Sequence, residues 1–508
     1  MSHALRSSTV DGIIRRSAHT FRDRVAVVFG ERKWTYAALD DAVSRAASRL
    51  LGLGLAKGDR VAAYGKNSDA YLIGFLACAR AGLVHVPLNY NLTGAELGYL
   101  IQQSGSRAIL VDPSLEAALD GVDTDVREQL EHRIPLRDKA GSVIETATEG
   151  VVAAIEADVT DTDLCQFLYT SGTTSRPKAA MMSHRALVHE YVSCLVGLDL
   201  TPEDAPLHVM PLYHSAQMHV FLMPWLAIGA TNTLLEVPDA GEILRRMEQD
   251  GHRAFFAAPT LWVALTNHPD FETRDLSGLQ KAYYGASIMP VPIIKRLESK
   301  MPGLGFYNCF GQSEIAPLAT ILRPEEHADR PDSAGRPCLF VEARVVDGEG
   351  NDVPVGDTGE IVYRSPQLCD GYWDNAEATE EAFAGGWFHS GDLVRMDEAG
   401  YVFVVDRIKD VINTGGVMVA SREIEDALYT HPAVAEVAVI GVPDEKWIEA
   451  VTAFVVRKAD VTAEELAAHA RNTLAGFKIP KHITFVDELP RNASGKILKR
   501  ELREYTVG

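Results

Sequence analysis

Short apolar runs alternate with amphipathic stretches along most of the chain. Residues 24–30 (RVAVVFG) predict a buried strand, and residues 35–54 repeat their apolar positions with the period of a helix that faces a core. Residues 69–82 predict a second, more deeply buried helix, and further strands are predicted over 83–89 and 107–112. This alternation favours an α/β fold of stacked layers with largely parallel sheets.

Polar residues that can cap a helix precede several of the helical stretches. Thr35 opens the first of them. Thr93 with Glu96, and Thr462 with Glu465, have the three-residue spacing of a capping box. We therefore expect helices to begin directly after Thr35, Thr93 and Thr462.

The pattern changes after about residue 335. Residues 341–366 form short apolar runs split by DGEGN and VGDTG turns, which predicts a small β-subdomain. The last hundred residues are long enough for a separate small α/β domain, in which Ser421 is positioned to cap a helix. We predict a large N-terminal domain over residues 1–408 and a small C-terminal domain over residues 409–508.

Composition narrows the class of protein. The net charge of -21 argues against nucleic acid as a partner, because such proteins present a basic surface. The six cysteines show no C-x-x-C pair, which disfavours a zinc site or a disulfide framework. No apolar run is long enough to cross a bilayer, and the first residues lack a signal-peptide core, so a cytoplasmic location is expected.

One loop carries candidate chemistry. Residues 169–178 (YTSGTTSRPK) follow an apolar run and combine glycine, bare hydroxyls and a lysine. Clustered backbone amides in such a loop can bind phosphate oxygens, and Lys178 would add a positive charge. The loop is not a Walker A motif, because Pro177 stands where that motif requires Gly-Lys. Taken alone, the same composition is also typical of an exposed turn.

Four further segments give the loop a context. They are FGQSE (310–314), GWFHSGDL (386–393), DRIKDVINTGG (406–416) and PRNASGKILKREL (490–502). Together with residues 169–178, in this order, they resemble the signature segments of the adenylate-forming superfamily. That superfamily comprises acyl-CoA synthetases, peptide-synthetase adenylation domains and luciferases, and the chain is most similar to a fatty-acyl-CoA ligase.

The resemblance implies an ATP-dependent acid–thiol ligase with two half-reactions. A carboxylate attacks the α-phosphate of ATP to give an acyl-adenylate and pyrophosphate, with Mg²⁺ as the cofactor. Coenzyme A then displaces AMP to give a thioester. The alternatives within the family are an enzyme specialised for one half-reaction and an enzyme that loads a carrier-protein thiol.

The resemblance also implies a nucleotide site. Residues that hold the β- and γ-phosphates are Thr170, Ser171, Gly172, Thr173, Thr174 and Lys178. Glu314 is the implied Mg²⁺ ligand. The remaining implied nucleotide contacts are Gly285, Ala286, Phe310, Gly311, Ser313, Asp392 and Arg407.

The implied catalytic lysine, Lys496, lies far from this loop in the sequence, so the C-terminal domain must deliver it. Lys409 occupies the hinge position, about which that domain would rotate between half-reactions. Gly415 and Gly416 would then line the tunnel for coenzyme A. His214 matches a position that gates the carboxylate pocket.

Two positions depart from the family pattern. Ala179 stands where glycine is usual, and a methyl group would strain the loop if φ were positive there. Val417 stands where an acidic residue often follows the Gly-Gly pair. Both departures leave the efficiency of the two half-reactions open.

The acid is expected to be hydrophobic. Residues 210–226 (MPLYHSAQMHVFLMPWL) should line its pocket, with Met218, Phe221 and Trp225 among the apolar side chains. The stretch contains neither an arginine for a second carboxylate nor an aspartate for an amino group. A fatty acid and a bulky cyclic or aryl acid fit equally well.

One alternative from a different class is a silent nucleotide-binding protein. Retention of Lys178, Glu314 and Lys496 argues against it. The oligomeric state is open, with a homodimer as one option.

Overall fold

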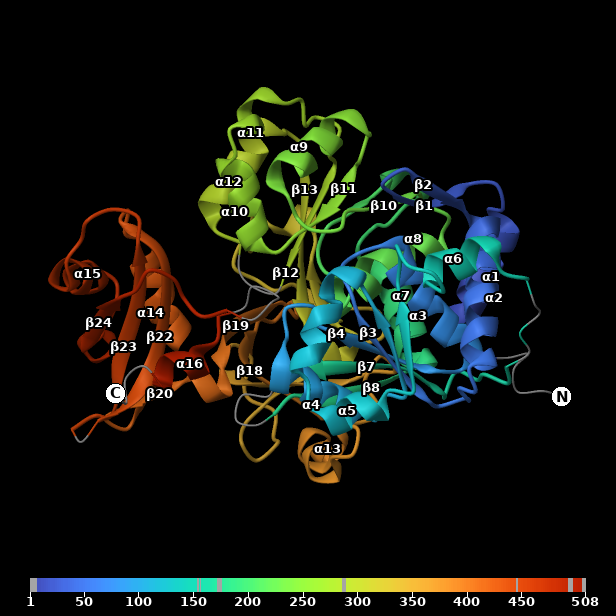
Figure 1. Cartoon of the computed structure of the whole chain (residues 1–508). Coiled ribbons are helices and arrows are strands. Elements are labelled where there is room, and N and C mark those ends of the chain that lie inside the picture. The colour runs from blue at the N-terminus through green and yellow to red at the C-terminus, as the bar shows by residue number, and fades with distance from the viewer. Residues whose placement is uncertain are drawn as a thin grey trace. The chain divides into compact units, whose positions relative to one another are not determined.

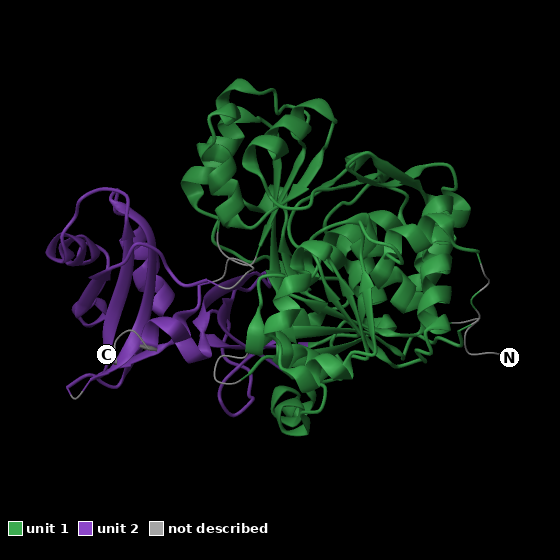
Figure 2. Ribbon diagram, in the orientation of Figure 1, with its two compact units in different colours: residues 1–342, 364–388 green, residues 343–363, 389–508 purple. Residues whose placement is uncertain are grey.

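The computed structural model describes residues 7–152, 155, 157–170, 176–285, 289–444, 446–491 and 497–504. The chain forms two compact units, shown in Figure 2. Unit 1 comprises Met1–Glu342 with Arg364–Phe388, and unit 2 comprises Ala343–Tyr363 with His389–Gly508. Within the described ranges, no helix is long and apolar enough to cross a membrane. The 408/409 domain boundary stays a prediction.

Unit 1 contains a six-stranded sheet in the order β6-β5-β3-β4-β7-β8 (Figure 1). Neighbouring strands within this sheet are parallel, except that β7 and β8 form an antiparallel pair. The strands are β3 (Arg60–Tyr64), β4 (Val84–Leu88), β5 (Ala108–Val111), β6 (His132–Pro135), β7 (Leu164–Thr170) and β8 (Lys178–Ser183).

A second sheet in unit 1 has nine strands in the order β15-β14-β13-β12-β11-β9-β10-β1-β2. Its centre is parallel, and antiparallel strands close both edges. The strands are β1 (Val25–Phe29), β2 (Arg32–Thr35), β9 (Leu207–His208), β10 (Asn232–Leu234), β11 (Ala254–Phe256), β12 (Lys281–Gly285), β13 (Gly305–Gly311), β14 (Leu318–Leu322) and β15 (Arg336–Pro337).

Helices pack between these two sheets. All residues of α3 (Asp69–Ala81) are buried, and the helix contacts β1 of one sheet and β3 and β4 of the other. Likewise, α7 (His184–Gly197) contacts β8 and β14. The remaining helices of unit 1 are α1 (Val10–Thr20), α2 (Tyr36–Gly52), α4 (Gly94–Ser104), α5 (Thr124–Gln129), α6 (Val143–Glu149), α8 (Met223–Ala227), α9 (Ala240–Gln249), α10 (Pro259–Asn267), α11 (Asp270–Thr273), α12 (Val291–Lys300) and α13 (Ala376–Ala382).

Unit 2 has two smaller sheets. The predicted β-subdomain is a four-stranded sheet of β16 (Glu342–Val346), β17 (Thr358–Arg364), β18 (Phe388–Met396) and β19 (Val402–Arg407). The other sheet has β20 (Ile412–Thr414), β21 (Val417–Val419), β22 (Val434–Asp444), β23 (Ile448–Arg457) and β24 (His482–Phe485). The helices are α14 (Ser421–Tyr429), α15 (Ala463–Ala470) and α16 (Lys499–Glu504). The predicted α/β class is confirmed.

Two of the predicted caps form and two do not. Thr35 accepts a hydrogen bond from the amide of Ala38, and Thr462 forms the predicted capping box with Glu465. Helix α4 begins directly after Thr93 as predicted, but the Thr93 side chain makes no capping hydrogen bond, so the predicted capping box was wrong. Ser421 is the first residue of α14 rather than its cap, because Asp406 accepts the Ser421 amide and hydroxyl instead.

Candidate active site

The candidate phosphate loop joins two paired strands of unit 1. Thr170, the last residue of β7, pairs directly with Lys178, the first residue of β8. The antiparallel pairing therefore fixes both ends of the loop. Of the predicted site residues, Ser171, Gly172, Thr173, Thr174, Ala286 and Lys496 lie outside the described residues.

One tyrosine contacts both Lys178 and Glu314. The Nζ atom of Lys178 lies 5.3 Å from the centre of the Tyr372 ring, a cation–π distance. The Tyr372 hydroxyl donates a hydrogen bond to Oε1 of Glu314 over 3.0 Å. Burial, and then the charge of Glu314, raise the pKa of Tyr372, so its hydroxyl stays protonated and remains a donor. Tyr372 thus links the loop cation to the predicted metal ligand.

Sequence reasoning missed Tyr372. The segment Gly371–Trp373 lies alongside β8. Two main-chain hydrogen bonds hold it there, one from the Trp373 amide to the Ala179 carbonyl (2.9 Å) and one from the Met181 amide to the Gly371 carbonyl (2.9 Å). The only signal in the sequence was a Gly-Tyr-Trp string, and such a string also fits an ordinary turn.

Glu314 lies in a tight turn between β13 and β14, and only 8% of it is exposed. A Cβ atom on Gly311 would lie 2.0 Å from the carbonyl oxygen of Pro317, so only glycine allows this close approach. Ala316 in the same turn has a left-handed φ of 74°. The turn is therefore held tightly by its surroundings.

The Glu314 turn also contacts the segment that carries His214. The hydroxyls of Ser313 and Ser215 lie 3.2 Å apart, and Nδ1 of half-buried His214 accepts the amide of Ala216. A π-helix, Ala216–Leu222, follows directly, and such helices often occur at functional sites. Lys178, Tyr372, Glu314, Ser313 and His214 thus form one connected group through their neighbours.

Three of the residues expected to line the acyl pocket are fully buried. Phe221 stacks on Phe256 with ring centres 4.3 Å apart, and Nε1 of Trp225 donates to Asp204. Met218 is also fully buried. All three side chains are buried among core residues, and their assignment to the acyl pocket stays a prediction.

A buried polar chain lies on the other side of the π-helix. His219 bonds the Tyr191 hydroxyl (2.9 Å) and Oε1 of Gln166 (2.6 Å), and Gln166 in turn bonds His85 (2.9 Å). Burial lowers the pKa of His219 and of His85 to about 3, so both rings are neutral near pH 7. They are structural groups that position the π-helix.

Gly285 and Phe310 lie on adjacent strands. A Cβ atom on Gly285 would lie 2.4 Å from the carbonyl oxygen of Cys309 in β13. Close contact between neighbouring strands therefore explains this glycine. Phe310 and Gly311 end β13 and pair with Thr320 and Leu318 of β14.

In unit 2, Asp392 and Arg407 are directly paired. They face each other across β18 and β19, and Nε of Arg407 lies 2.7 Å from Oδ1 of Asp392. Nη1 of Arg407 also donates to the carbonyl of Ser390 over 3.0 Å. The pair is largely buried and presents a carboxylate beside a guanidinium.

The predicted hinge and glycine pair also lie in unit 2. Lys409 is in a short 3₁₀ turn, and its carbonyl accepts Nη2 of Arg503 over 3.3 Å. Gly415 and Gly416 form the β20–β21 turn with φ values of 65° and 86°, which L side chains rarely adopt. Val417, which follows them, is 44% exposed.

The Ala179 departure causes no strain. Ala179 pairs with Tyr169 inside the regular β7–β8 ladder, and its φ is not positive. Its methyl group is fully buried. The residue therefore packs as a normal strand position.

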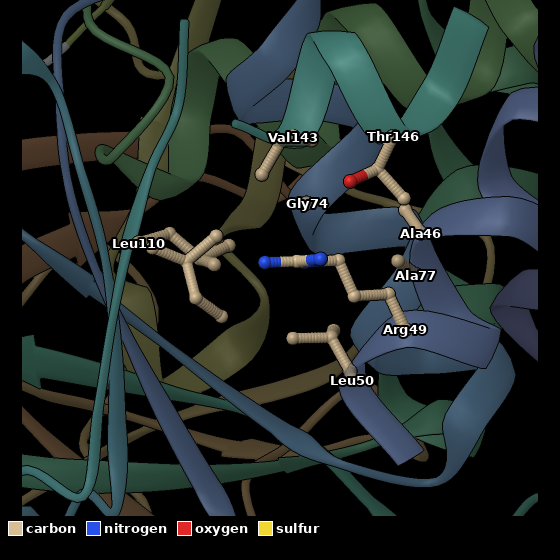
Figure 3. A pocket seen from close by; sticks show the side chains of 9 residues that line it. Ala46, Arg49, Leu50, Gly74, Ala77, Leu110, Val143 and Thr146 are labelled. Carbon is tan, nitrogen blue, oxygen red and sulfur yellow. The ribbon is translucent and has the colours of Figure 1, made fainter. Parts of the chain in front are cut away.

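A small hollow elsewhere in unit 1 does not belong to this site. It lies between α2, α3, α6 and β5, and Arg49 extends across it toward Leu110 (Figure 3). The rest of its lining is mostly aliphatic, and it includes no predicted site residue.

Comparisons with known proteins identify the family. The family model described as "AMP-binding enzyme" matches residues 14–373, and that described as "AMP-binding enzyme C-terminal domain" matches residues 423–496. The chain belongs to the AMP-binding enzyme family. The predicted adenylate-forming superfamily is thereby confirmed.

Several relatives of this AMP-binding enzyme are named as CoA ligases or CoA synthases. A feruloyl-CoA synthase from Amycolatopsis is 38% identical over 96% of this chain and 97% of its own length. A 3-[(3aS,4S,7aS)-7a-methyl-1,5-dioxo-octahydro-1H-inden-4-yl]propanoyl:CoA ligase from Mycobacterium tuberculosis is 33% identical over 98% of both. Among solved structures, ATP-bound MatB from Rhodopseudomonas palustris aligns with a TM-score of 0.90 at 31% identity, covering 98% of this chain and 99% of that one. These likenesses support an AMP-forming acyl-CoA ligase that uses ATP and coenzyme A.

Proposed function

We propose that this AMP-binding enzyme activates a bulky cyclic or aryl monocarboxylic acid as its acyl-adenylate and transfers the acyl group to coenzyme A. The observation that carries the proposal is the link from the β7–β8 loop base through Tyr372 to Glu314. A loop rich in amides and hydroxyls beside a cation suits phosphate oxygens, and a nearby carboxylate suits the Mg²⁺ that accompanies a polyphosphate.

In the first step, a carboxylate oxygen of the acid bonds to the α-phosphorus of ATP, and the bond to pyrophosphate breaks. Two anions approach each other, so donors and cations must offset the charge that develops. We assign Thr170, Lys178 and the loop between them to the β- and γ-phosphates. Lys496 is assigned to the reacting carboxylate and α-phosphate, and His214 to the entrance of the acid pocket.

Mg²⁺ fits the residues present. Among the described residues, no cluster of three or more His, Cys, Asp or Glu side chains could form a self-sufficient metal site. A hard cation bound to nucleotide phosphates needs only one or two protein carboxylates. Glu314 would supply that carboxylate, with Oε1 already oriented by Tyr372. When bound, the ion would neutralise phosphate charge.

Unit 2 supplies the remaining roles in this proposal. Asp392 would accept hydrogen bonds from the ribose hydroxyls, while Arg407 orients the carboxylate through its ion pair with Oδ1. The C-terminal domain would rotate about Lys409. This rotation would remove Lys496 from the reacting groups and bring in the Gly415–Gly416 turn. The thiol of coenzyme A would then attack the acyl carbon, and AMP would leave with one oxygen of the original carboxylate.

The choice of acid follows from the relatives and from the site. Ferulate and the indane-derived propanoate named for the relatives are both bulky, cyclic and monocarboxylic. The loop before the π-helix includes half-buried Met210 and Tyr213 and offers apolar surface. It contains no Lys or Arg that could pair with a second carboxylate of the acid. A long-chain fatty acid is the competing substrate, because a ligase for such acids is 32% identical.

The proposed setting is the cytoplasm. All six cysteines are free thiols, which fits a reducing compartment. A homodimer is the proposed assembly, and sedimentation velocity at micromolar concentration tests it.

The test is a panel of carboxylic acids with ATP, Mg²⁺ and coenzyme A. AMP release and thioester mass should both appear with hydroxycinnamic or bicyclic acids and stay low with dodecanoate. A carrier-protein thiol replaces coenzyme A in a parallel arm. AMP release without a thioester in either arm, or a preference for dodecanoate, would contradict the proposal.

A further inference from the structure

A buried glutamate lies behind the Glu314 turn, and the proposed function does not use it. Glu190 is on the inward face of α7 and is fully buried. Acidic residues are almost never fully buried unless they are paired, and among the described residues no cation lies within ion-pair distance of Glu190. Its partners are all neutral donors. Such a costly group calls for an explanation beyond filling space.

The donors to Glu190 come from three elements. Oε1 of Glu190 accepts the main-chain amide of Leu318 over 3.0 Å and the thiol of Cys194 over 3.4 Å. Oε2 accepts Nε2 of Gln367 over 2.6 Å. Leu318 begins β14, directly after the turn that holds Glu314. Glu190 therefore ties α7 to the end of the Glu314 turn.

Gln367 extends this contact to the carbonyl groups of the same turn. Its Nε2 also lies 3.1 Å from the carbonyl oxygen of Leu318 and 3.4 Å from that of Ile315. Its Oε1 accepts the hydroxyl of Ser193 over 2.6 Å, which fixes the direction of the amide. Glu190 and Gln367 together thus bind three main-chain groups on either side of the Ala316–Pro317 bond.

The segment that carries Gln367 reaches Glu314 twice more. The amide of Cys369 donates to the carbonyl of Glu314 over 2.8 Å, and Tyr372 donates to its carboxylate. The turn between these anchors contains Ala316 in the left-handed region, which costs free energy for a residue with a side chain. Such a conformation persists only where surrounding contacts impose it.

We propose that Glu190 and Gln367 are positioning residues that hold the Glu314 turn in the shape required to present its carboxylate to the nucleotide-bound metal. The proposal rests on the proposed function of Glu314. It differs from a purely structural role in one respect. Burial raises the pKa of Glu190 well above its ordinary value, because the ionised carboxylate has no cation to offset its lost hydration. An isosteric amide removes this cost, so it should change stability little while disturbing the turn.

Glu190→Gln makes the test sharp. In either orientation the new amide nitrogen would face a donor, either Nε2 of Gln367 or the main-chain amide of Leu318. One of the contacts to the Glu314 turn must therefore be lost. Mn²⁺ serves as the probe in place of Mg²⁺, and its binding in the presence of a nonhydrolysable ATP analogue is measured by electron paramagnetic resonance. We expect Mn²⁺ binding about tenfold to a hundredfold weaker, the usual effect of losing a group that orients a metal ligand. The thermal midpoint should stay close to the wild-type value, because a costly buried charge is removed while a buried hydrogen bond is lost.

Two further variants complete the design. Gln367→Ala removes the same carbonyl contacts from the other side and should weaken Mn²⁺ binding to a similar degree, which keeps the test valid if Glu190→Gln does not fold. Leu39→Ala, in the core of α2, is the control for lost stability. It should lower the thermal midpoint and leave Mn²⁺ binding unchanged.

Wild-type Mn²⁺ affinity in both Glu190→Gln and Gln367→Ala would overturn the proposal. Amide hydrogen exchange over residues 313–322 gives a second measurement that needs no nucleotide. We expect faster exchange there in Glu190→Gln. Unchanged exchange would also overturn the proposal that Glu190 and Gln367 hold the Glu314 turn. If the wild type shows no ATP–pyrophosphate exchange with any acid, the proposed function is contradicted instead. The amide hydrogen exchange would then still test whether Glu190 and Gln367 hold the turn.

Discussion

Replacing Tyr372 with phenylalanine removes one hydroxyl and leaves the ring in place. That hydroxyl makes a 3.0 Å hydrogen bond to the Glu314 carboxylate, which is 8% exposed. A hydrogen bond to a charged group contributes about 1.5–3 kcal/mol. If the bond orients Glu314 in the transition state, kcat/KM for ATP should fall about 10- to 150-fold, since 1.4 kcal/mol is a factor of ten.

The ring makes a separate and smaller contribution. Lys178 lies 5.3 Å from the ring centre, and a partly exposed cation–π contact is worth about 0.5–1 kcal/mol. Tyr372→Leu should therefore lose a further two- to fivefold or so beyond Tyr372→Phe. We expect this extra loss mainly in KM for ATP, because Lys178 is assigned to the phosphates in ground and transition states alike.

The assay is acid-dependent ATP–pyrophosphate exchange, with ATP and Mg²⁺ varied separately. Tyr307 offers a matched control. Its hydroxyl donates a 2.9 Å hydrogen bond to the carboxylate of Asp199 rather than to Glu314. Tyr307→Phe removes the same kind of bond from a buried tyrosine outside the candidate site, so it should leave exchange within about twofold of wild type even if stability falls. Equal rates in Tyr372→Phe and Tyr307→Phe would refute the reasoning.

Three other variants test separate parts of the account. Lys496→Ala should lower acyl-adenylate formation by about two to three orders of magnitude, the effect of removing one preorganised charge contact, and unchanged pyrophosphate release would oppose its assignment. Lys409→Pro should keep pyrophosphate exchange but lose thioester formation, measured by mass, because proline restricts the preceding residue at the proposed hinge; loss of both activities would not fit a hinge. His219 has a folded pKa of about 3 against an ordinary 6.5, so the unfolded state gains the proton first as pH falls, and stability is lost below about pH 6.5. Between pH 7 and pH 5 this costs about 2 kcal/mol, so urea titrations of His219→Gln should show a pH-dependent loss smaller by that amount, and an identical loss would contradict the neutral-ring assignment.

Local sequence carried much of the fold and part of the site. The sequence predicts that the hydroxyl-rich loop follows an apolar run, whereas the antiparallel strand that closes the loop at Lys178 is seen only in the structure. Glu314 likewise follows its strand directly, so the segment itself indicates its place.

Contacts between distant segments were beyond such reasoning. Tyr372 reaches Lys178 because its segment runs along β8, and nothing near either residue in the sequence encodes that pairing. Glu190 and Gln367 meet for the same reason. Apolar periodicity also fails to separate a pocket wall from a core, so the assignment of Phe221 and Trp225 to the acyl pocket stays a prediction.

The central claim is that a carboxylate oxygen bonds to the α-phosphorus of ATP, and oxygen-18 tests it most directly. The acid is labelled in its carboxylate, turned over with ATP, Mg²⁺ and coenzyme A, and the products are analysed by mass spectrometry. The account predicts one labelled oxygen in AMP and none in pyrophosphate. Label in pyrophosphate or inorganic phosphate, or AMP formed without label, would contradict it.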